Sequence, residues 1–336
     1  MLGRSNLKFD VEIPTCREGV FVPAPFAGPN QIIELIKLAE QLGYYAVWGT
    51  DFWTPHSRIP ESTDIPPNWY EVMISLSYAA AVTDKIKLGT GVVLLPYRDP
   101  IILAKQVATL DQFSNGRFLL GIGLGVRPEF EAINTRQKKA HRGRMLDEKL
   151  EALIFLLSHT QEEYSFNGEY VQFENVNLNP KPVQNPLPMY SPGRNPGSLR
   201  RIAKNAMGYM IRNSEAKDRL DAIEPFLHEY GRDISELDVV AESHLSLAGT
   251  HEDAVANYQN SRLGNQSKNM NIGDINKVIA DNWIGTVSEV VQKIVSTKAM
   301  GISHYLALHI AGDTVEAQIE QMQIFAEEVI PQVESA

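Results

Sequence analysis

Residues 86–123 read IKLGTGVVLLPYRDPIILAKQVATLDQFSNGRFLLGIG, and this stretch decides the fold. It opens with an apolar run of strand length, after which Asp99-Pro100 predicts a helix N-cap and a first-turn proline. Gly116-Arg117 then predicts a turn into a second apolar run, Phe118–Gly123. A strand, a helix and a strand in this order predict one unit of a parallel sheet.

The same alternation continues on both sides of this stretch and predicts eight such units. The strands are expected near Leu7–Pro14, Tyr45–Trp53, Ile86–Pro96, Phe118–Gly123, Pro188–Ser191, Met207–Arg212, Leu237–Ala248 and Ser303–Ile310. No Gly-rich dinucleotide motif follows the first strand and no strong linker divides the chain, so a closed (β/α)₈ TIM barrel is favoured over an open sheet. We expect one α/β domain over residues 1–336, with its active site where the C-terminal ends of the strands meet.

Two segments exceed what a barrel needs. Residues 160–187, after the fourth helix, have the pattern of a small hairpin insertion. Residues 251–282 follow the seventh strand, and two interpretations stay open there: a lid over the active site, or an inert insertion. Beyond them, Thr286 and Glu289 predict a capping box for the penultimate helix.

Composition narrows the class of protein. The chain has 336 residues, 43% hydrophobic and 21% charged, which suits a globular protein with a large core. Its formal charge of −10 disfavours nucleic acid as a partner, and its apolar runs are too short to cross a membrane. The single Cys16 excludes an internal disulfide. The sequence therefore predicts a soluble, cytoplasmic protein, and it suggests no metal site.

The stretch from Leu88 to Gly125 resembles the bacterial-luciferase-like oxidoreductases, and particularly their deazaflavin-dependent branch. The resemblance covers roughly residues 28–210 and 283–330 and is weak between them. Its supporting motifs are Arg142-Gly143-Arg144 with Glu148, Asn179–Gln184, and Gly285-Thr286. It implies a barrel that binds coenzyme F420 or, alternatively, FMN. It also implies a homodimer.

The resemblance assigns cofactor binding to two segments. In the third strand the family has a bulge with a cis non-prolyl peptide that supports the tricyclic ring, which places that bond near Gly91-Val92; the residues concerned are Gly89, Thr90, Gly91 and Val92. These glycines are otherwise explained by packing within the barrel. After the fifth strand, a Gly-containing loop at a helix start is expected to hold the cofactor phosphate, unless it is only a turn. The candidates there are Ser191, Gly193, Arg194, Asn195 and Ser198.

The catalytic candidates are Asp51, His56 and His309. The family commonly ends its second strand with an acidic residue and a histidine, but here Asp51 is followed by Phe52. His56 is a candidate to replace that histidine, or it is a surface residue. His309 ends the eighth strand at the catalytic face, and its alternative role is a neutral histidine bonded to a loop carbonyl. Leu124 stands where luciferase has an arginine against the flavin phosphate, which favours the deazaflavin branch.

The substrate pocket is expected to contain Phe52, Trp53, Tyr70 and Arg212. The three aromatic residues are equally explained by packing, and Arg212 by an ion pair with a loop carboxylate. Three functions remain open. The first is hydride transfer between a deazaflavin and a small organic substrate. The second is a two-component monooxygenase that takes reduced FMN from a separate flavin reductase, and the third is a non-catalytic flavin-binding protein.

Overall fold

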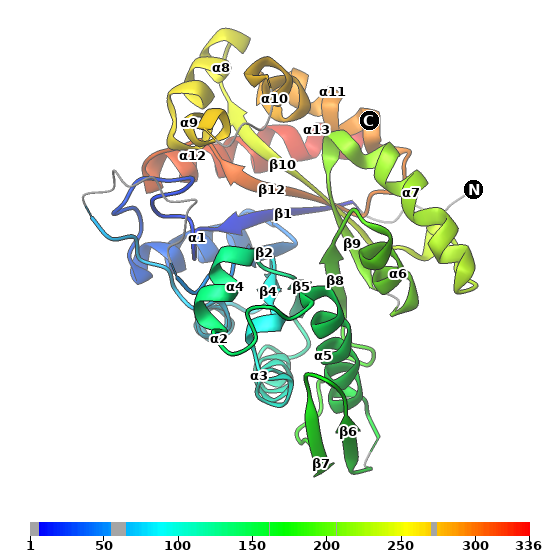
Figure 1. Cartoon of the computed structure of the whole chain (residues 1–336). Coiled ribbons are helices and arrows are strands. Elements are labelled where there is room, and N and C mark those ends of the chain that lie inside the picture. Colours follow the sequence, from blue (N-terminus) through cyan, green and yellow to red (C-terminus); the bar gives the residue numbers. More distant parts are fainter. Residues whose placement is uncertain (1–6, 55–64, 161, 206, 270–273) are drawn as a thin grey trace.

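The computed structural model describes residues 7–54, 65–160, 162–205, 207–269 and 274–336. Eight parallel strands in this part close into a barrel, because β1 pairs with β2 on one side and with β12 on the other (Figure 1). These strands, in order around the barrel, are β1 (Lys8–Ile13), β2 (Ala46–Gly49), β3 (Lys87–Thr90), β5 (Phe118–Gly123), β8 (Met189–Pro192), β9 (Gly208–Arg212), β10 (Val239–Leu247) and β12 (His304–Ile310). The (β/α)₈ fold expected from the sequence is confirmed.

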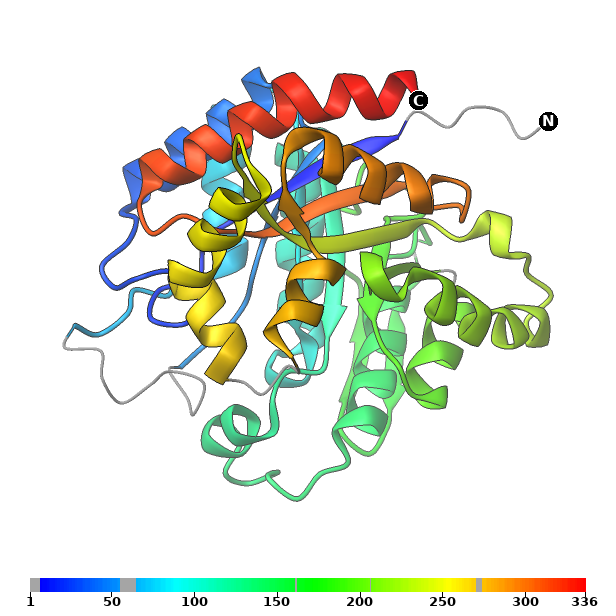
Figure 2. The ribbon, with the colours of Figure 1, turned by 90° about the horizontal axis from the view of Figure 1, so that it is seen from above.

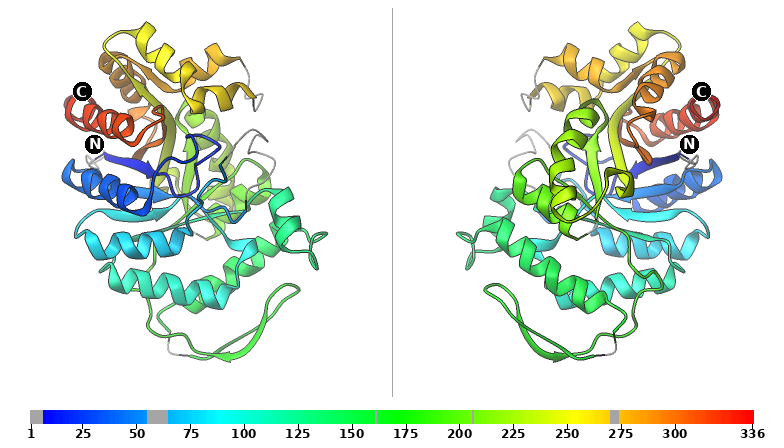
Figure 3. Two further views of the ribbon diagram at one scale, coloured as in Figure 1. Left: turned by 90° about the vertical axis from the view of Figure 1, so that its left-hand side faces the viewer. Right: turned by 90° about the vertical axis from the view of Figure 1, so that its right-hand side faces the viewer.

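Helices surround the strands (Figure 3). The helices that follow the barrel strands are α1 (Pro29–Gln41), α2 (Val72–Val82), α3 (Pro100–Phe113), α5 (Arg142–Leu157), α6 (Pro196–Lys204), α7 (Ala216–Glu229), α11 (Val287–Lys298) and α12 (Val315–Ile324). The first and last of them, α1 and α12, lie side by side and close the outer layer (Figure 2). The predicted N-cap Asp99 and the predicted capping box of Thr286 with Glu289 are both confirmed.

Further short elements complete the chain. The additional helices are α4 (Arg127–Ile133), α8 (His251–Asn260), α9 (Arg262–Asn269), α10 (Ile275–Asp281) and α13 (Ile330–Ser335). The additional strands are β4 (Val93–Leu94), β6 (Tyr164–Asn167), β7 (Gln172–Val176) and β11 (Trp283–Gly285). Strands β6 and β7 form an antiparallel hairpin that extends away from the barrel (Figure 1). Residues 251–282 contain helices α8, α9 and α10.

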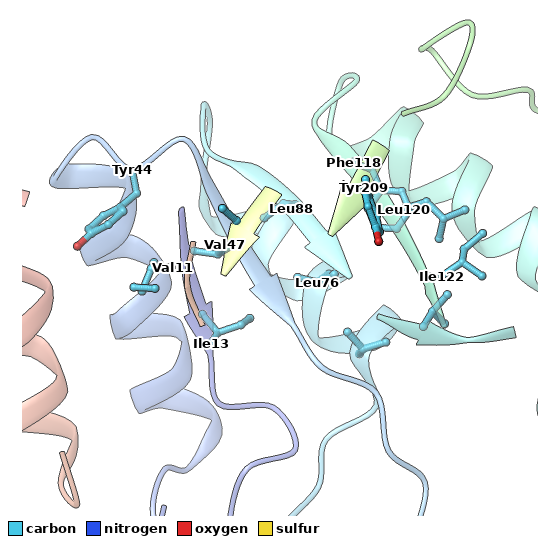
Figure 4. Close-up of a cluster of buried hydrophobic side chains, with 14 of the residues drawn as sticks. Val11, Ile13, Tyr44, Val47, Leu76, Leu88, Phe118, Leu120, Ile122 and Tyr209 are labelled. Carbon is cyan, nitrogen blue, oxygen red and sulfur yellow. The ribbon is translucent and has the colours of Figure 1, made fainter. Parts of the chain in front are cut away.

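The core has two layers, because successive side chains of a strand point to opposite faces. Val47 packs outward against the helices, whereas Trp48 points into the barrel. Figure 4 shows the outer layer, where Val11, Val47 and Leu88 lie on neighbouring strands. Each such buried aliphatic side chain contributes about 1.5–3 kcal/mol to stability. The inner layer forms an apolar floor below the active-site end of the barrel; its buried members are Ala46, Trp48, Leu119, Tyr190, Met210, Val240 and Leu306.

The third strand differs from the continuous run predicted over 86–96. Strand β3 ends at Thr90, the Gly91-Val92 peptide is cis, and β4 resumes pairing with β5 at Val93. The bend and its predicted position are confirmed, and the predicted single strand is wrong. The second strand is also shorter than predicted, since it ends at Gly49 and a loop begins at Thr50.

Close packing explains two of the glycines around this bend. A Cβ atom on Gly89 would lie 2.4 Å from the Trp48 ring. A Cβ atom on Gly121 would lie 1.9 Å from the Thr90 carbonyl oxygen, because β3 and β5 approach closely there. Thr90 Oγ1 donates to Gly121 O at 2.8 Å and accepts from Gly121 N at 2.9 Å. Packing therefore requires glycine at both positions.

A buried polar network closes the other end of the barrel, where the strands begin. His304 is fully buried, with Nδ1 2.8 Å from Asp10 Oδ2 and Nε2 3.3 Å from Asp238 Oδ2. Asp10 Oδ2 also accepts from Trp48 Nε1 at 2.9 Å. Burial alone would lower the pKa of His304, but the two carboxylates outweigh it and raise that pKa to about 9. Lys8 Nζ lies 3.0 Å from His304 Nε2.

This network predicts a pH-dependent stability. The folded pKa of His304 is about 9 and its ordinary value is 6.5, so the protonated ring stabilises the fold fully below pH 6.5. That contribution, on the order of 3 kcal/mol, is lost as the pH rises from 6.5 through 9. Urea unfolding at pH 6 and pH 9.5 measures it. The His304→Leu variant should lack this part of the pH dependence, and an equal loss in both proteins would contradict the assignment.

Candidate active site

A cavity of about 710 Å³ opens at the end of the barrel where the strands end, and we call it the mouth cavity. It lies between the ends of β9, β10 and β12 and helix α10. The side chains of Arg17, Arg212, Arg219 and Lys277 line it, together with His244, His309 and several carboxylates. A larger cavity of about 1170 Å³ lies at the opposite end, beside the first residues of β1 and β3. Barrel enzymes react at the C-terminal end of their strands, so the mouth cavity is the candidate site.

His309 and Glu12 form a hydrogen-bonded pair on the wall of the barrel at this end. His309 Nδ1 lies 2.8 Å from Glu12 Oε2, and Glu12 is also ion-paired with Arg17. Burial raises the pKa of Glu12 to about 7 against the attraction of Arg17. Burial lowers the pKa of His309 well below its ordinary value. At neutral pH His309 is therefore an uncharged ring, held at Nδ1 by Glu12 and also hydrogen-bonded to the Leu308 backbone.

A bulge in β12 places His309 beside a second histidine. Ser243 of β10 pairs with Ala307, but the next residue, His244, pairs with His309, so that Leu308 is skipped. The two imidazole rings lie 5.1 Å apart between centroids. Phe21, from the loop after β1, stacks on His309 at 4.3 Å. The mouth cavity is therefore bordered by two adjacent histidines.

Asp51 is buried away from the mouth cavity and holds the bend after β3. Its carboxylate accepts from Arg98 Nη2 at 2.9 Å and from Leu94 N at 3.0 Å. Burial raises the pKa of Asp51 although Arg98 opposes this. Arg98 also pairs with Glu71 at 2.7 Å. These contacts with Arg98 and Leu94 hold the Asp51 side chain at the end of β2.

The predicted phosphate loop lies between β8 and α6, at the same end of the barrel. Asn195 caps α6, accepting from Ser198 N at 3.0 Å, while Ser198 Oγ donates to Asn195 O at 2.7 Å. A Cβ on Gly193 would lie 2.3 Å from Ser198 Cβ. Ser191 is buried, and its hydroxyl donates to Ile122 O at 3.0 Å. The side chains of Ser191, Asn195 and Ser198 therefore shape the loop by bonding to the protein.

Arg194 is the exposed cation of this loop. Its side chain is 61% exposed, and Nη2 lies 3.4 Å from Glu215 Oε1. Glu215 also pairs with Arg219 at 2.6 Å, and both of these residues line the mouth cavity. Arg212, at the end of β9, lines the cavity without an ion pair to any described residue. The structure thus brings Arg194, Arg212 and His309 to one end of the barrel.

The three aromatic candidates belong to the loop after β2. The Phe52 ring lies 5.5 Å from the Trp69 ring, and the Arg98 guanidinium lies over Trp53 at 5.1 Å. Tyr70 packs against the main core. None of the three lines the mouth cavity, and Trp53 is 42% exposed. His56 lies outside the described residues.

The sequence analysis did not single out Glu12 and Arg17. A signal was available, since β1 reads KFDVEI and its two acids alternate with apolar residues, which places Asp10 and Glu12 on the inner face of the barrel.

Among the described helices, none has the length and apolar character needed to cross a membrane. In that same part of the chain, no group of three or more histidines, cysteines or carboxylates is arranged to hold a metal ion.

Comparisons with known proteins identify the family of the chain. The chain matches the family model of luciferase-like monooxygenases over residues 15–304. It is 28% identical to the 5,10-methylenetetrahydromethanopterin reductase of Methanopyrus kandleri over 68% of this chain and 65% of that protein, so the match spans just under two thirds of that relative. It is 25% identical to the oxygenase component of the flavin-dependent trigonelline monooxygenase of Acinetobacter baylyi, over 90% of this chain and 89% of that protein.

The solved structures show the same fold. Monooxygenase RslO1 from Streptomyces bottropensis superposes with a TM-score of 0.78 and 24% identity, covering 97% of this chain and 99% of that one. The family model covers most of the chain, and the relatives include an F420-dependent dehydrogenase from Kineococcus radiotolerans and the flavin-dependent monooxygenase above. The chain belongs to the luciferase-like monooxygenase family.

Proposed function

We propose that this protein uses coenzyme F420 to move a hydride to or from a small organic substrate bound in the mouth cavity. The observation that carries the proposal is the pairing of His309 with Glu12 on a polar cavity wall. Hydride loss from a carbon that bears a hydroxyl requires a base for the hydroxyl proton, and a neutral histidine oriented by a carboxylate is such a base. The deazaflavin-linked reductase of Methanopyrus kandleri supports the choice of cofactor.

The residues present fit a phosphate-bearing cofactor. Arg194 is exposed, Arg212 has no ion pair with a described residue, and α6 begins at the same loop. Helix N-termini and unpaired arginines attract anions. The bend at Gly91-Val92 adjoins the apolar floor, against which Val92 and Leu308 both pack. Gly91, Val92 and Gly193 would therefore support the ring and phosphate mainly through backbone and shape, with Gly89 and Thr90 bracing the bend.

When bound, the cofactor would supply the hydride acceptor or donor. The protein's own residues would accept the substrate proton and return it. Nε2 of His309 would accept the proton of a substrate hydroxyl during oxidation and return it during reduction, while Glu12 holds the ring's orientation. Helix α10, from the segment 251–282, forms one wall of the cavity and would limit access of water. Closure of this segment as a lid stays a prediction.

The second candidate is a monooxygenase that takes reduced FMN from a separate flavin reductase. The trigonelline monooxygenase of Acinetobacter baylyi, which matches 90% of this chain, favours it. An oxygen-using flavin is best protected in a dry, apolar pocket, however, and charged side chains line the mouth cavity. The third hypothesis, a non-catalytic flavin-binding protein, gives no reason for a base such as the His309–Glu12 pair.

Cofactor titration separates these functions. Purified protein is titrated with F420 and with FMN, and binding is followed by quenching of cofactor fluorescence. Binding of F420 with little binding of FMN, followed by F420 reduction in a screen of small alcohols, is the expected result. Oxygen consumption with reduced FMN and a substrate would overturn the deazaflavin assignment. Binding of a cofactor without turnover of any substrate would favour the third hypothesis.

Arg194 provides a specific prediction for the phosphate loop. The Arg194→Ala variant should weaken cofactor binding by about 1.5–3 kcal/mol, because a charged hydrogen bond to phosphate is lost. The same fluorescence titration measures the change in Kd. Arg200→Ala is the matched control, since Arg200 is an exposed arginine of α6 paired with Glu229. An unchanged Kd for the Arg194 variant would remove Arg194 from the cofactor site.

We also propose that the protein forms a homodimer through helices α2 and α3. Their outer faces carry exposed large apolar residues: Ile74, Tyr78, Ile102 and Phe113. A groove of about 600 Å³ runs between them, and clusters of this kind mark interfaces. Light scattering should give a dimer for the native chain and a monomer for Ile102→Asp. Tyr230→Asp, at an exposed apolar residue after α7, should stay dimeric. A monomeric native protein would refute the proposal.

A further inference from the structure

His244 differs from His309 in its hydrogen-bond partner, and that partner comes from the segment 251–282. His244 Nδ1 lies 2.8 Å from the hydroxyl of Tyr258 on α8. The Tyr258 hydroxyl lies 3.0 Å from Ser267 Oγ on α9. Ser267 Oγ in turn donates to the Leu263 carbonyl at 2.9 Å. These four groups form one chain of hydrogen bonds that begins at the mouth cavity and ends at a backbone carbonyl.

The direction of this chain fixes the tautomer of His244. A carbonyl oxygen only accepts hydrogen bonds, so Ser267 donates its single hydroxyl proton to the Leu263 carbonyl. Ser267 Oγ must then accept from Tyr258, and Tyr258 has no proton left for His244. His244 therefore carries its proton on Nδ1 and donates it to Tyr258. Its Nε2 is left as a hydrogen-bond acceptor.

The same reasoning applies to His309. An ionised carboxylate accepts, so above the pKa of Glu12, about 7, the Nδ1–H of His309 donates to Glu12 and Nε2 is again an acceptor. The side-chain partners of the two rings, Tyr258 and Glu12, both lie at Nδ1, and the His309 ring also has a hydrogen bond with the Leu308 backbone. Both rings line the mouth cavity, and the bulge at Leu308 places them in register. Burial, together with nearby Arg212 and Arg17, lowers the pKa of both rings well below the ordinary value, so both are neutral.

The backbone of His244 is held as firmly as its ring. Asn282 Oδ1, directly after α10, accepts from His244 N at 2.9 Å and from Ser243 Oγ at 3.3 Å. Helices α8, α9 and α10 thus all contribute to the placement of one side chain. Contacts from these three helices therefore fix both the backbone and the ring of His244.

We propose that His244 is a second substrate-binding residue and that Tyr258 and Ser267 are positioning residues that present its Nε2 as an acceptor. Two neighbouring imidazole acceptors recognise a ligand group with two hydrogen-bond donors, and a vicinal diol has that chemistry. The inference rests on the mouth cavity of the proposed function. It does not depend on which cofactor binds.

The tautomers can be read directly by NMR of the protein labelled with ¹⁵N in its histidine rings. Variants His244→Gln and His309→Gln assign the two rings. At pH 8.5, where Glu12 is ionised, both rings should be neutral and protonated on Nδ1, the form that is less common for free histidine. Tyr258→Phe removes the acceptor, and Ser267→Ala frees the Tyr258 proton to bond Nδ1. Both variants should convert His244 to the Nε2–H form and leave His309 unchanged.

Tyr230→Phe is the control, because Tyr230 is exposed outside the cavity. A native His244 ring protonated on Nε2, or one that is cationic, would overturn the positioning role. So would a Tyr258→Phe protein that is folded and keeps the native tautomer. The Ser267→Ala variant provides an independent test if Tyr258→Phe does not fold.

The ligand class is tested with cis-cyclohexane-1,2-diol, with cyclohexanol as the matched single alcohol. The diol should shift the Nε2 resonances of both rings with one common, saturable dependence on concentration. Cyclohexanol should give a binding constant at least about tenfold weaker, since one good hydrogen bond is missing. A diol that shifts neither ring or only one, or that binds no better than cyclohexanol, would overturn the diol assignment. Failure of cofactor binding would leave both NMR results intact and would count against the proposed function alone.

Discussion

Replacing His309 by glutamine will lower kcat/KM by about 10²–10⁴-fold, with the protein still folded. Glutamine fills a similar space but cannot accept the substrate proton, and a lost general base has an effect of this size. The rate is measured with an alcohol that reduces F420 in the screen described above. His251→Gln, the same substitution at an exposed histidine of α8, is the control and should leave kcat/KM unchanged.

The pH dependence separates catalysis from a structural role. In the native protein kcat/KM should fall on the acid side as the His309–Glu12 pair takes up a proton, because Glu12 has a pKa of about 7. The His309→Gln variant should lose that limb of the profile. Unchanged kcat/KM, or the same acid limb in the variant, would exclude His309 as the base.

Replacing Asp51 by alanine will reduce the free energy of unfolding by about 3–5 kcal/mol, since it removes the fully buried partner of the Arg98 charge and leaves only the partly exposed Glu71. The Leu94 amide loses its acceptor in the same variant. Urea denaturation followed by circular dichroism measures the loss. Glu131→Ala breaks an exposed pair with Arg127 and should change stability little.

A double substitution sharpens this test. In Asp51→Leu with Arg98→Met both charges are gone, so the loss of stability should be smaller than the sum of the two single losses. Additive losses, or a loss below about 1 kcal/mol for Asp51→Ala, would mean that the pair does not hold the bend.

The fold was predictable because its signals are local. The βα alternation, the cap at Asp99 and the capping box of Thr286 with Glu289 each depend on neighbouring residues, and all appear in the structure. The bend at Gly91-Val92 was predictable only through the resemblance. The exact end of β3 was not, because an apolar run such as Val92–Leu95 carries no sign of where pairing with β5 resumes.

The candidate site was less predictable because it depends on contacts between distant segments. Asp51 is a catalytic candidate from the sequence, and only the structure shows its pairing with Arg98, 47 residues away. Asn195 and Ser198 are phosphate candidates from the sequence, and only the structure shows that each bonds the other at the start of α6. The juxtaposition of His244 with His309 follows from one skipped residue in β12, which no periodicity can reveal.

A crystal structure of the protein with bound F420 tests the central claim most directly. The ring should lie against Gly91-Val92 with its reactive carbon facing the mouth cavity and Nε2 of His309, and the phosphate should lie at the loop that carries Gly193 and Arg194. A ring bound elsewhere, or one whose reactive carbon is separated from His309 by the barrel wall, would contradict the proposed function.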